Sequence, residues 1–434
     1  MATLEAVTGA DRASPANLRH IVLASVLGTT VEWYDFLIYG VGAALVFNKL
    51  FFPSFDPLVG TLAAFGSYAV GFVARPLGGA IFGHYGDRLG RKAMLTLTMI
   101  IMGGGTFLIG LLPTYEQIGI FAPILLITLR LLQGIGIGGE WGGAVLMVIE
   151  SGDPKRRGFL GSLVQVGFPL GMVLATIVFA AVSKLPESDF LAWGWRVPFL
   201  ISFLLVGVGM FVRLKLVETP KFRELQDHDE VAEMPIFDVL RRDWRNFLIA
   251  VGLKLTEVAW VYILTVFIVF YAASRLGLSR SIILDAVLYA ALLELITIPL
   301  FGILSDKIGR KPMYAAGAIL SALLAFPLFA LLDTKDTLTI SLTIAVVMSL
   351  THALMFGPQA AFLPELFGTK VRYSGASLGC QVSAAISGGF APLIATGLLT
   401  WENGTRSISL YLVGLAAVTL LAVIASKETA FRDL

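Results

Sequence analysis

A small set of ionisable side chains lies inside long apolar stretches of this sequence, where charge is unfavourable. A charged side chain at the centre of a bilayer costs about 2.5–3.5 kcal/mol on insertion scales, so each such residue needs a function or a partner. The residues in question are Glu32, Asp35, Arg75, Arg130, Glu140, Lys254, Glu257 and Glu294. Arginines of this kind are suited to binding an anion, and the acids are suited to taking up a proton.

Asp35 and Arg130 are the pair best placed for such chemistry. At about 1.5 Å per residue from the expected helix ends, both lie roughly 20–25 Å deep, and Arg75 lies at about 13 Å. Arginine stays cationic and can hold a carboxylate through two parallel hydrogen bonds. A carboxylate beside it can take up a proton when a substrate acid competes for the arginine. The pair therefore either couples an anion to a proton or is a permanent packing pair.

Two neighbours of Asp35 share its helix face. Glu32 lies one turn before it and Tyr39 one turn after it, because residues three and four apart are neighbours on a helix surface. Glu32 is therefore included with Asp35 among the candidate substrate- and proton-coupling residues.

The composition excludes an ordinary soluble protein. Hydrophobic residues make up 57% and charged residues 14% of the chain, against roughly 25% charged residues in soluble domains. Cys380 is the one cysteine, and the four histidines lack ligand spacing, so neither a disulfide framework nor a metal site is expected. His352 has no acid beside it in the sequence and is interpreted as a satisfied polar residue, with a proton relay as the alternative.

The apolar stretches predict an all-α membrane protein. A helix needs about 20 apolar residues to cross a bilayer core, and twelve stretches of that kind occur. They begin near Ile21, Pro57, Ala93, Ile118, Phe159, Trp195, Phe247, Ile282, Met313, Leu338, Gly375 and Ser407. We expect an N-terminal tail (1–18), a six-helix bundle (19–217), a cytoplasmic linker (218–245), a second six-helix bundle (246–426) and a C-terminal tail (427–434).

The basic residues predict the orientation. With both termini in the cytoplasm, the inner segments hold most of the 32 Lys and Arg residues, as the excess of positive charge in cytoplasmic loops requires. No cleavable signal peptide is recognised, because the first apolar stretch is too long for one. We therefore expect a multi-pass protein of a bacterial-type inner membrane with both termini inside.

The two halves are copies of one another. Three paired signals recur in the same order, which indicates parallel six-helix repeats with a site between them near the middle of the membrane. A turn in the first half, with Gly83, Asp87, Arg88, Gly90 and Arg91, recurs with Gly302, Asp306, Lys307, Gly309 and Arg310; Glu150 and Arg157 recur as Glu365 and Arg372; Glu218–Thr219 recurs as Glu428–Thr429.

These repeated turns resemble the signature of the major facilitator superfamily. Further segments resemble its metabolite:proton symporter family, which includes permeases for α-ketoglutarate, citrate and shikimate, and for the zwitterions proline and betaine. The segments are Thr29–Phe36, Ala74–Gly78, Arg130–Gly134 with Gly138–Gly143, and Trp193–Phe199. The resemblance implies a twelve-helix major facilitator fold, alternating access and a monomer in the lipid bilayer, with a small molecule and protons as partners and no nucleic acid.

The resemblance also implies that the repeated turns latch helix ends together as gates. Asp87 and Asp306 would meet helix N-termini or arginines, and Lys307, Arg310, Glu140, Glu150 and their repeat partners belong to the same group. Side chains expected to line a cavity, with helix packing as the alternative, are Tyr34, Tyr39, Gln165, Trp260, Glu294 and Gln381.

The repeat leaves the partner of Lys254 open. The register that superimposes Asp306 on Asp87 places Lys254 on Asp35 and Glu294 on Arg75, so the charges are reversed. Helices one and seven should face each other across the pseudo-two-fold axis. Lys254 is therefore expected to pair either with Asp35 across the halves or with Glu257, its neighbour on the same helix.

The leading interpretation is a proton-coupled symporter of a mono- or dicarboxylate. An osmolyte or zwitterion carrier is disfavoured by the lack of heptads after the last apolar stretch, and a proton-independent uniporter leaves the helix-one acids unexplained. An enzyme would need a nucleophile–base set or a metal cluster, a channel a filter, and an ATP-driven pump a phosphate-binding loop. No cofactor is expected, and the proton is the expected coupling ion.

Overall fold

A computed structural model describes residues 15–53, 55–89, 91–138, 141–214, 235–368 and 371–432. Within these ranges the chain forms helices and no strands. Several expected gate residues fall outside what is described: Gly90 and Glu140 altogether, and Gly83, Asp87, Arg88 and Arg91 as far as their side chains are concerned.

The first half consists of six membrane-crossing segments. Long helices form here because every backbone polar group in lipid must be paired within the segment itself. In chain order they are α1 (Pro15–Gly42) with η1 (Ala43–Phe47) and α2 (Asn48–Leu50); α3 (Pro57–Leu89); α4 (Arg91–Leu111); α6 (Phe121–Ile137) with α7 (Trp141–Ser151); η2 (Pro154–Arg156), α8 (Arg157–Gln165) and α9 (Gly167–Ser183); and η3 (Phe190–Gly194) with α11 (Arg196–Leu214). Short helices α5 (Tyr115–Ile118) and α10 (Glu187–Asp189) lie in the connections.

The second half repeats this plan. Its segments are α14 (Trp244–Tyr262) with η4 (Ile263–Phe267), α15 (Ile268–Tyr271) and η5 (Ala272–Leu276); α16 (Arg280–Ile308); α17 (Arg310–Leu332); α18 (Thr337–Met348), η6 (Ser349–Ala353) and α19 (Leu354–Glu365); α20 (Arg372–Ser383), η7 (Ala384–Gly389) and α21 (Ala391–Leu398); and α22 (Gly404–Ala425). Among the described residues, eleven segments are long and apolar enough to cross a membrane, and the shorter apolar helix Thr96–Leu111 supplies the third crossing. The expected twelve-helix fold is confirmed.

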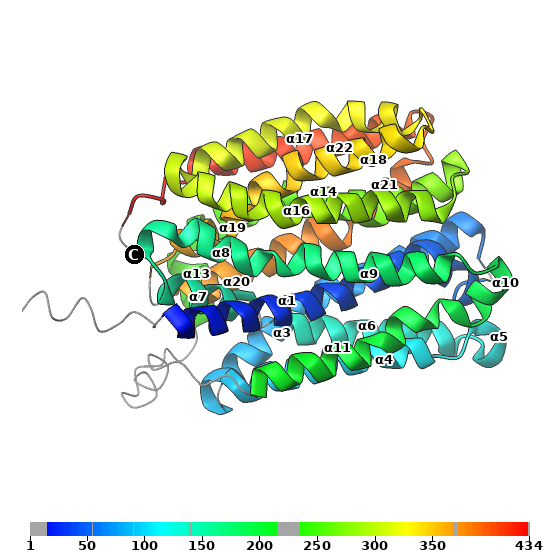
Figure 1. Cartoon of the computed structure of the whole chain (residues 1–434), viewed down its shortest axis with the longest axis horizontal. Coiled ribbons are helices and arrows are strands. Elements are labelled where there is room, and N and C mark those ends of the chain that lie inside the picture. Colours follow the sequence, from blue (N-terminus) through cyan, green and yellow to red (C-terminus); the bar gives the residue numbers. More distant parts are fainter. Residues whose placement is uncertain are drawn as a thin grey trace, which may run out of the picture.

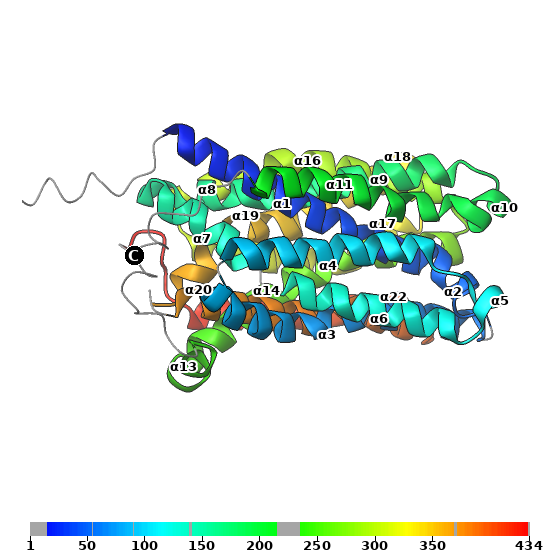
Figure 2. The same ribbon diagram turned by 90° about the horizontal axis from the view of Figure 1, so that it is seen from below.

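Part of the expected linker, 218–245, is helical: α13 (Pro235–Arg242) lies there, and α14 begins at Trp244. Figure 2 shows α13 beside the bundle, at the end where the C-terminus lies.

The two halves form two groups of long, roughly parallel helices. Figure 1 shows the first-half helices α1, α3, α4, α6, α9 and α11 below, and the second-half helices α14, α16, α17, α18 and α22 above. Both the start of α1 and the chain's C-terminus lie at one end of the bundle, which we call the terminal end. Across the interface, α8 and α9 pack against α16 and α19, and α3 packs against α20 and η7.

Burial separates inner from outer segments. In the segment Trp244–Leu276, 94% of the most apolar window is buried inside the protein, but in Glu187–Phe211 the share is 28%. The first of these segments therefore faces protein almost all round, and the second has a broad face left for lipid. Four π-helical turns (η1, η4, η6 and η7) interrupt the more buried segments one, seven, ten and eleven, and such turns are frequent at functional sites.

Candidate functional site

Arg130 lies at the centre of the first half and is fully buried. Its guanidinium stacks 4.1 Å from the ring centroid of Phe36 and 4.2 Å from that of Tyr39. Nη1 donates to Gln133 Oε1 at 3.3 Å, but Nε and Nη2 have no hydrogen-bond partner. Buried donors of a cation are costly to leave unpaired, so these two N–H groups are suited to receive a carboxylate.

The helix beside Arg130 makes room for it. A Cβ at Gly71 on α3 would lie 2.5 Å from Arg130 Nε and 3.0 Å from Cζ. Gly71 therefore lets the guanidinium lie against α3, under Tyr39, whose hydroxyl is bonded to Ser67 Oγ at 2.8 Å.

Asp35 does not form the direct ion pair with Arg130 that we expected. Its Oδ1 accepts a hydrogen bond from Ser202 Oγ on α11, and Oδ2 has no partner of ordinary hydrogen-bond geometry. Thr106 on α4 lies beside this carboxylate. Gln133 Nε2 donates to Thr106 Oγ1 at 2.6 Å, and the Thr106 hydroxyl donates to Met102 O at 3.0 Å. Gln133 and Thr106 are therefore polar neighbours of the two charges, without a continuous hydrogen-bond chain between Arg130 and Asp35 among the described contacts.

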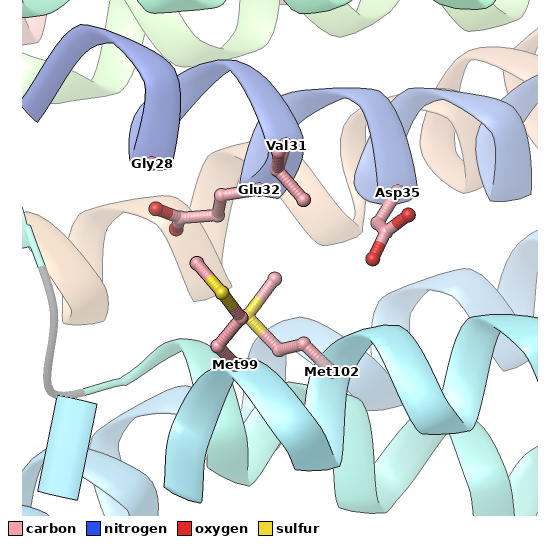
Figure 3. Close-up of a pocket in the computed structure, with 6 residues that line it drawn as sticks. All are labelled: Gly28, Val31, Glu32, Asp35, Met99 and Met102. Atoms are coloured by element: carbon pink, nitrogen blue, oxygen red, sulfur yellow. The ribbon is translucent and has the colours of Figure 1, made fainter. Parts of the chain in front are cut away.

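Glu32 and Asp35 line a small cavity between α1 and α4. Gly28 and Val31 complete its α1 wall, and methionines of α4 face them. Figure 3 shows both carboxylates pointing from α1 toward Met99 and Met102. Glu32 and Gly28 precede Asp35 on α1, so the cavity extends from Asp35 toward the terminal end.

Arg75 lies near Arg130 within an aromatic cluster. Its guanidinium stacks 4.1 Å from the ring centroid of Phe36 and 4.4 Å from that of Phe72, and its Nε has no partner. Tyr262 of the second half packs against the same rings, 5.1 Å from Phe72 between centroids. The two arginines therefore lie at the interface between the halves, although the sequence count placed Arg75 at a shallower depth.

Lys254 pairs within its own half. Its Nζ lies 3.3 Å from Glu257 Oε2 and donates to Gln359 Oε1 at 2.8 Å. Gln359 Nε2 in turn donates to Glu257 Oε2 at 2.8 Å. Of the two alternatives left open by the sequence, this structure has the pair on the same helix and no ion pair between Lys254 and Asp35 among the described contacts.

His352 has both ring nitrogens paired, as expected of a satisfied polar residue, but its acidic partners come from other helices and were not recognised in the sequence. Its Nδ1 lies 2.7 Å from Glu294 Oε1 on α16, and its Nε2 lies 3.1 Å from Glu257 Oε1 on α14. All three side chains are at most 2% exposed. His352 therefore joins Glu257 and Glu294 in one buried cluster, which we call the Glu–His–Glu cluster.

The expected lining residues divide between the interface and helix packing. Gln165 Nε2 donates to Phe356 O at 3.4 Å, and Gln381 Nε2 to Gly138 O at 3.5 Å. Both glutamines thus bridge the halves in the same way. Tyr34 instead donates to Pro198 O at 2.7 Å and ties α1 to α11, while Trp260 is buried with its Nε1 unpaired.

At the terminal end, Asp306 reaches across the interface. Its two oxygens accept the backbone N–H groups of Gly158 and Phe159 at 2.8 and 2.9 Å, at the N-terminus of α8. Arg310 Nη1 donates to the same carboxylate at 2.8 Å. The aspartate meets both a helix N-terminus and an arginine, which are the contacts expected of a latch; Lys307 is exposed.

The repeated acid–arginine pairs exchange partners between the halves. Arg157 Nε lies 3.2 Å from Glu365 Oε1, and Arg372 Nη1 lies 3.7 Å from Glu150 Oε1. Each arginine thus pairs with the acid of the other repeat. The pairs are unequal, because Glu365 is fully buried and the Glu150 side chain is 40% exposed.

Glu428 holds the C-terminal segment to the same region. Its carboxylate accepts the backbone N–H groups of Arg310 and Lys311 at 2.9 and 3.0 Å, at the start of α17. Partial burial raises the pKa of this carboxyl, but backbone donors outweigh it and lower the pKa below its usual value. Arg157 Nη2 also donates to Arg432 O at 2.6 Å, so the segment contacts both halves.

Comparisons with known proteins agree with this architecture. A family model described as Major Facilitator Superfamily matches residues 38–386, with a second match over residues 258–430. The chain is 41% identical to a shikimate transporter of Escherichia coli (strain K12) over 420 residues, 96% of each chain. It is 35% identical over 447 residues to a proline/betaine transporter of the same strain, covering 100% of this chain and 87% of the relative.

A solved structure shares the fold at low sequence identity. The xylose transporter XylE from E. coli, in a partially occluded inward-open conformation, superimposes with a TM-score of 0.74 at 17% identity, covering 96% of this chain and 100% of that chain. Its likeness shows the fold alone. The twelve helices, the family match and the full-length relatives together lead to one conclusion: the chain is a multi-pass membrane transporter, not an enzyme, and belongs to the Major Facilitator Superfamily.

Proposed function

We propose that this protein carries a small organic acid across the membrane together with protons, by alternating access. The observation that carries the proposal is the buried Arg130 with two unpaired N–H groups, beside Arg75 with a third. A substrate carboxylate would satisfy the Arg130 pair through two parallel hydrogen bonds. Such charge-assisted bonds stabilise a complex by about 1.5–3 kcal/mol each.

Asp35 is proposed to take up the proton that is carried together with this anion. In the unloaded site its carboxylate feels the charge of Arg130 without pairing with it, and the polar side chains of Gln133 and Thr106 are the neighbours of the two groups. An anion on Arg130 would offset the arginine's charge, and the buried Asp35 would then favour its neutral form. The cavity beside Glu32 supports this role, since it approaches Asp35 from the terminal end. With the termini in the cytoplasm, that end is the inner side.

The aromatic cluster favours an anion over an osmolyte. A quaternary ammonium needs free ring faces for cation–π contacts. Phe36 and Phe72 already have guanidinium groups over their rings. The shikimate transporter among the relatives makes shikimate the first substrate to test, and the proline/betaine transporter keeps zwitterions as the competing class.

The test is uptake by purified protein in proteoliposomes under an imposed inward proton gradient. Labelled shikimate, lactate and a dicarboxylate would be compared with proline and betaine. We expect accumulation of an acid above its equilibrium level that disappears when the gradient is dissipated. Accumulation of zwitterions alone would overturn the substrate class, and uptake indifferent to the gradient would leave a uniporter.

Coupled transport of this kind needs no partner protein. We propose a monomer in a bacterial-type inner membrane, with the proton as the coupling ion. Arg157, Glu365, Asp306 and their neighbours would hold the terminal end closed while the site faces outward.

A further inference from the structure

The Glu–His–Glu cluster of the second half is not used by the proposed Asp35–Arg130 chemistry. It lies in α14, α16 and η6, whereas Asp35 and Arg130 lie in α1 and α6. Three ionisable groups buried together in a membrane protein require a function or strict charge compensation. The distances from His352 to the two carboxylates determine how many protons the cluster holds.

Both ring nitrogens of His352 face a carboxylate oxygen within hydrogen-bond distance. A ring nitrogen and a carboxylate oxygen that both present lone pairs repel each other at 2.7 or 3.1 Å unless a proton lies between them, so the two contacts hold two protons in total. A neutral imidazole supplies only one. The second proton is carried either as the other ring N–H, or as the O–H of Glu257 or Glu294. The cluster therefore holds one proton more than a neutral histidine beside two ionised acids.

The charges around the cluster fit this loaded state. With the extra proton, the cluster carries one net negative charge, and the ammonium of Lys254, 3.3 Å from Glu257, neutralises it. Loss of the proton would leave an uncompensated buried charge, which is unfavourable away from water. The other titratable groups that interact with Glu257 or Lys254 from packed helices are Tyr314 on α17 and Cys380 on α20. Within the described residues, neither adds a second cation.

One oxygen of the cluster is still unpaired. Glu294 Oε2 is buried without a hydrogen-bond partner, whereas both oxygens of Glu257 are engaged by His352, Gln359 or Lys254. The ionised form of Glu294 is therefore less well stabilised than that of Glu257. When the proton leaves the ring, we expect it to move to Glu294.

The cluster faces the interface between the halves, where it can be uncovered. The His352 ring lies 4.9 Å from that of Phe168 on α9, and Lys254 Nζ lies 5.9 Å from the ring of Trp141 on α7. Both rings belong to the first half. Separation of the halves during alternating access would remove this apolar cover and admit water to the cluster.

We propose that Glu257, His352 and Glu294 form a second proton-binding site, which takes up one proton from the side to which it opens and releases it on the other. The proton is shared between the imidazole and a carboxylate, and no other bond forms or breaks. The transport part of this proposal rests on the proposed symport; the binding part does not. The protein would then carry one proton at Asp35 and another at this cluster.

Proton binding can be measured without transport. Protein labelled with ¹⁵N-histidine, in lipid nanodiscs, gives ring-nitrogen signals that distinguish protonated from bare nitrogens. The His352 signal is identified by its loss in His352→Gln. We expect it to report loss of one proton within the range from about pH 5 to pH 10, at lower pH in Glu294→Gln because that carboxylate no longer shares the proton. The exposed Asp285 on the same helix supplies the control, Asp285→Asn, with an unchanged titration.

Transport stoichiometry is the second readout. In proteoliposomes, the substrate gradient that just balances an imposed proton gradient gives the number of protons carried per substrate. At a pH where the His352 signal shows the proton bound in wild type but lost in Glu294→Gln, wild type and Asp285→Asn should exceed Glu294→Gln by one proton. An invariant protonation state of His352 over the whole pH range, or equal stoichiometry in Glu294→Gln at that pH, would overturn the proposal. Uptake in wild type that ignores the pH difference would instead overturn the symport itself, and the histidine titration would still decide whether the cluster binds a proton.

Discussion

The two halves of this transporter share one helical plan but place opposite chemistry at its centre. The first half presents two arginines with unpaired N–H groups against aromatic rings. The second presents two glutamates that are engaged by a histidine, a lysine and a glutamine. The arginines of the first half lack acceptors for some of their N–H groups. These two glutamates of the second half have hydrogen-bond or ion-pair partners for all their oxygens except Glu294 Oε2.

In the proposed symport this difference separates the substrate from the second proton. An unpaired buried cation stabilises a bound anion, so we propose the first half as the place of the substrate acid. A compensated acid–imidazole cluster can exchange a proton without receiving a substrate. The two halves therefore share the helical scaffold and have one bridging glutamine each, Gln165 and Gln381, but they differ in the charges at their centres.

Of the variants considered, loss of Arg130 should change substrate affinity the most. Arg130→Gln removes the donors for the anion, and two charge-assisted hydrogen bonds at about 1.5–3 kcal/mol each predict at least a 100-fold fall in apparent substrate affinity. Labelled-acid binding to purified protein measures it. Gln359→Ala, in the second half, should leave this affinity within a few-fold. Equal losses in both variants would contradict the assignment of the anion to the first half.

Asp35→Asn should separate binding from coupling. The amide keeps the size of the carboxylate but cannot take up a proton, so exchange of labelled for unlabelled acid should persist while gradient-driven accumulation falls by roughly tenfold or more. Both are measured in the same proteoliposomes. Intact accumulation in the variant would exclude Asp35 as the coupling acid.

A smaller effect should follow from crowding Arg130. The Cβ of Gly71→Ala would lie 2.5 Å from Arg130 Nε, and overpacking of this kind costs about 1–3 kcal/mol. We expect about a tenfold loss of substrate affinity. Gly66→Ala on the same helix meets no atom within 4 Å and is the matched control. Identical affinities would show that the guanidinium position is not critical.

The gate pairs at the terminal end should differ from each other. Removing one partner of a buried ion pair is costlier than removing one partner of an exposed pair, which contributes about 0–1 kcal/mol. Glu365 keeps Arg310 as a second partner at 3.2 Å, so the cost of losing Arg157 stays below about 3–5 kcal/mol, the cost of a fully uncompensated buried charge. Arg157→Gln should therefore lower the melting temperature and the turnover rate more than Arg372→Gln, whose partner is 40% exposed. The reverse order would refute the ranking by burial.

Glu428→Gln should give the smallest change. The native carboxyl has a lowered pKa in the folded state, so its contribution to stability is present above the unfolded pKa and is lost as pH falls through the folded one. Wild type should accordingly lose its stability advantage over the variant below about pH 4. Melting temperatures recorded from pH 7 downward test this, and an advantage independent of pH would contradict it.

The fold was predictable because membrane helices and a duplicated signature are local features of a sequence. The order of the segments and the two halves follow from such patterns, and the latch contacts of Asp306 were implied by the resemblance to the major facilitator superfamily. The partners of mid-membrane charges were not predictable in the same way. Arg130 and Asp35 were expected at similar depths, yet Arg130 donates to Gln133 and Asp35 accepts from Ser202, because rotation about each helix axis is fixed by packing and not by depth.

His352 shows the same limit more sharply. Its two acids lie on other segments, far from it in sequence, and nothing within one helix turn reveals them. The one available signal was that three ionisable residues, Glu257, Glu294 and His352, occupy three buried spans of the same half. Gln133 was visible beside Arg130 at i+3, a spacing that predicts the observed contact.

The most direct test of the account is substrate-induced proton movement. Wild-type proteoliposomes in weakly buffered medium would receive the transported acid, with external pH recorded by electrode, beside Asp35→Asn. We expect alkalinisation of the medium in step with acid uptake for wild type, and one proton fewer taken up per acid in Asp35→Asn. Acid uptake by wild type without alkalinisation would contradict proton-coupled symport.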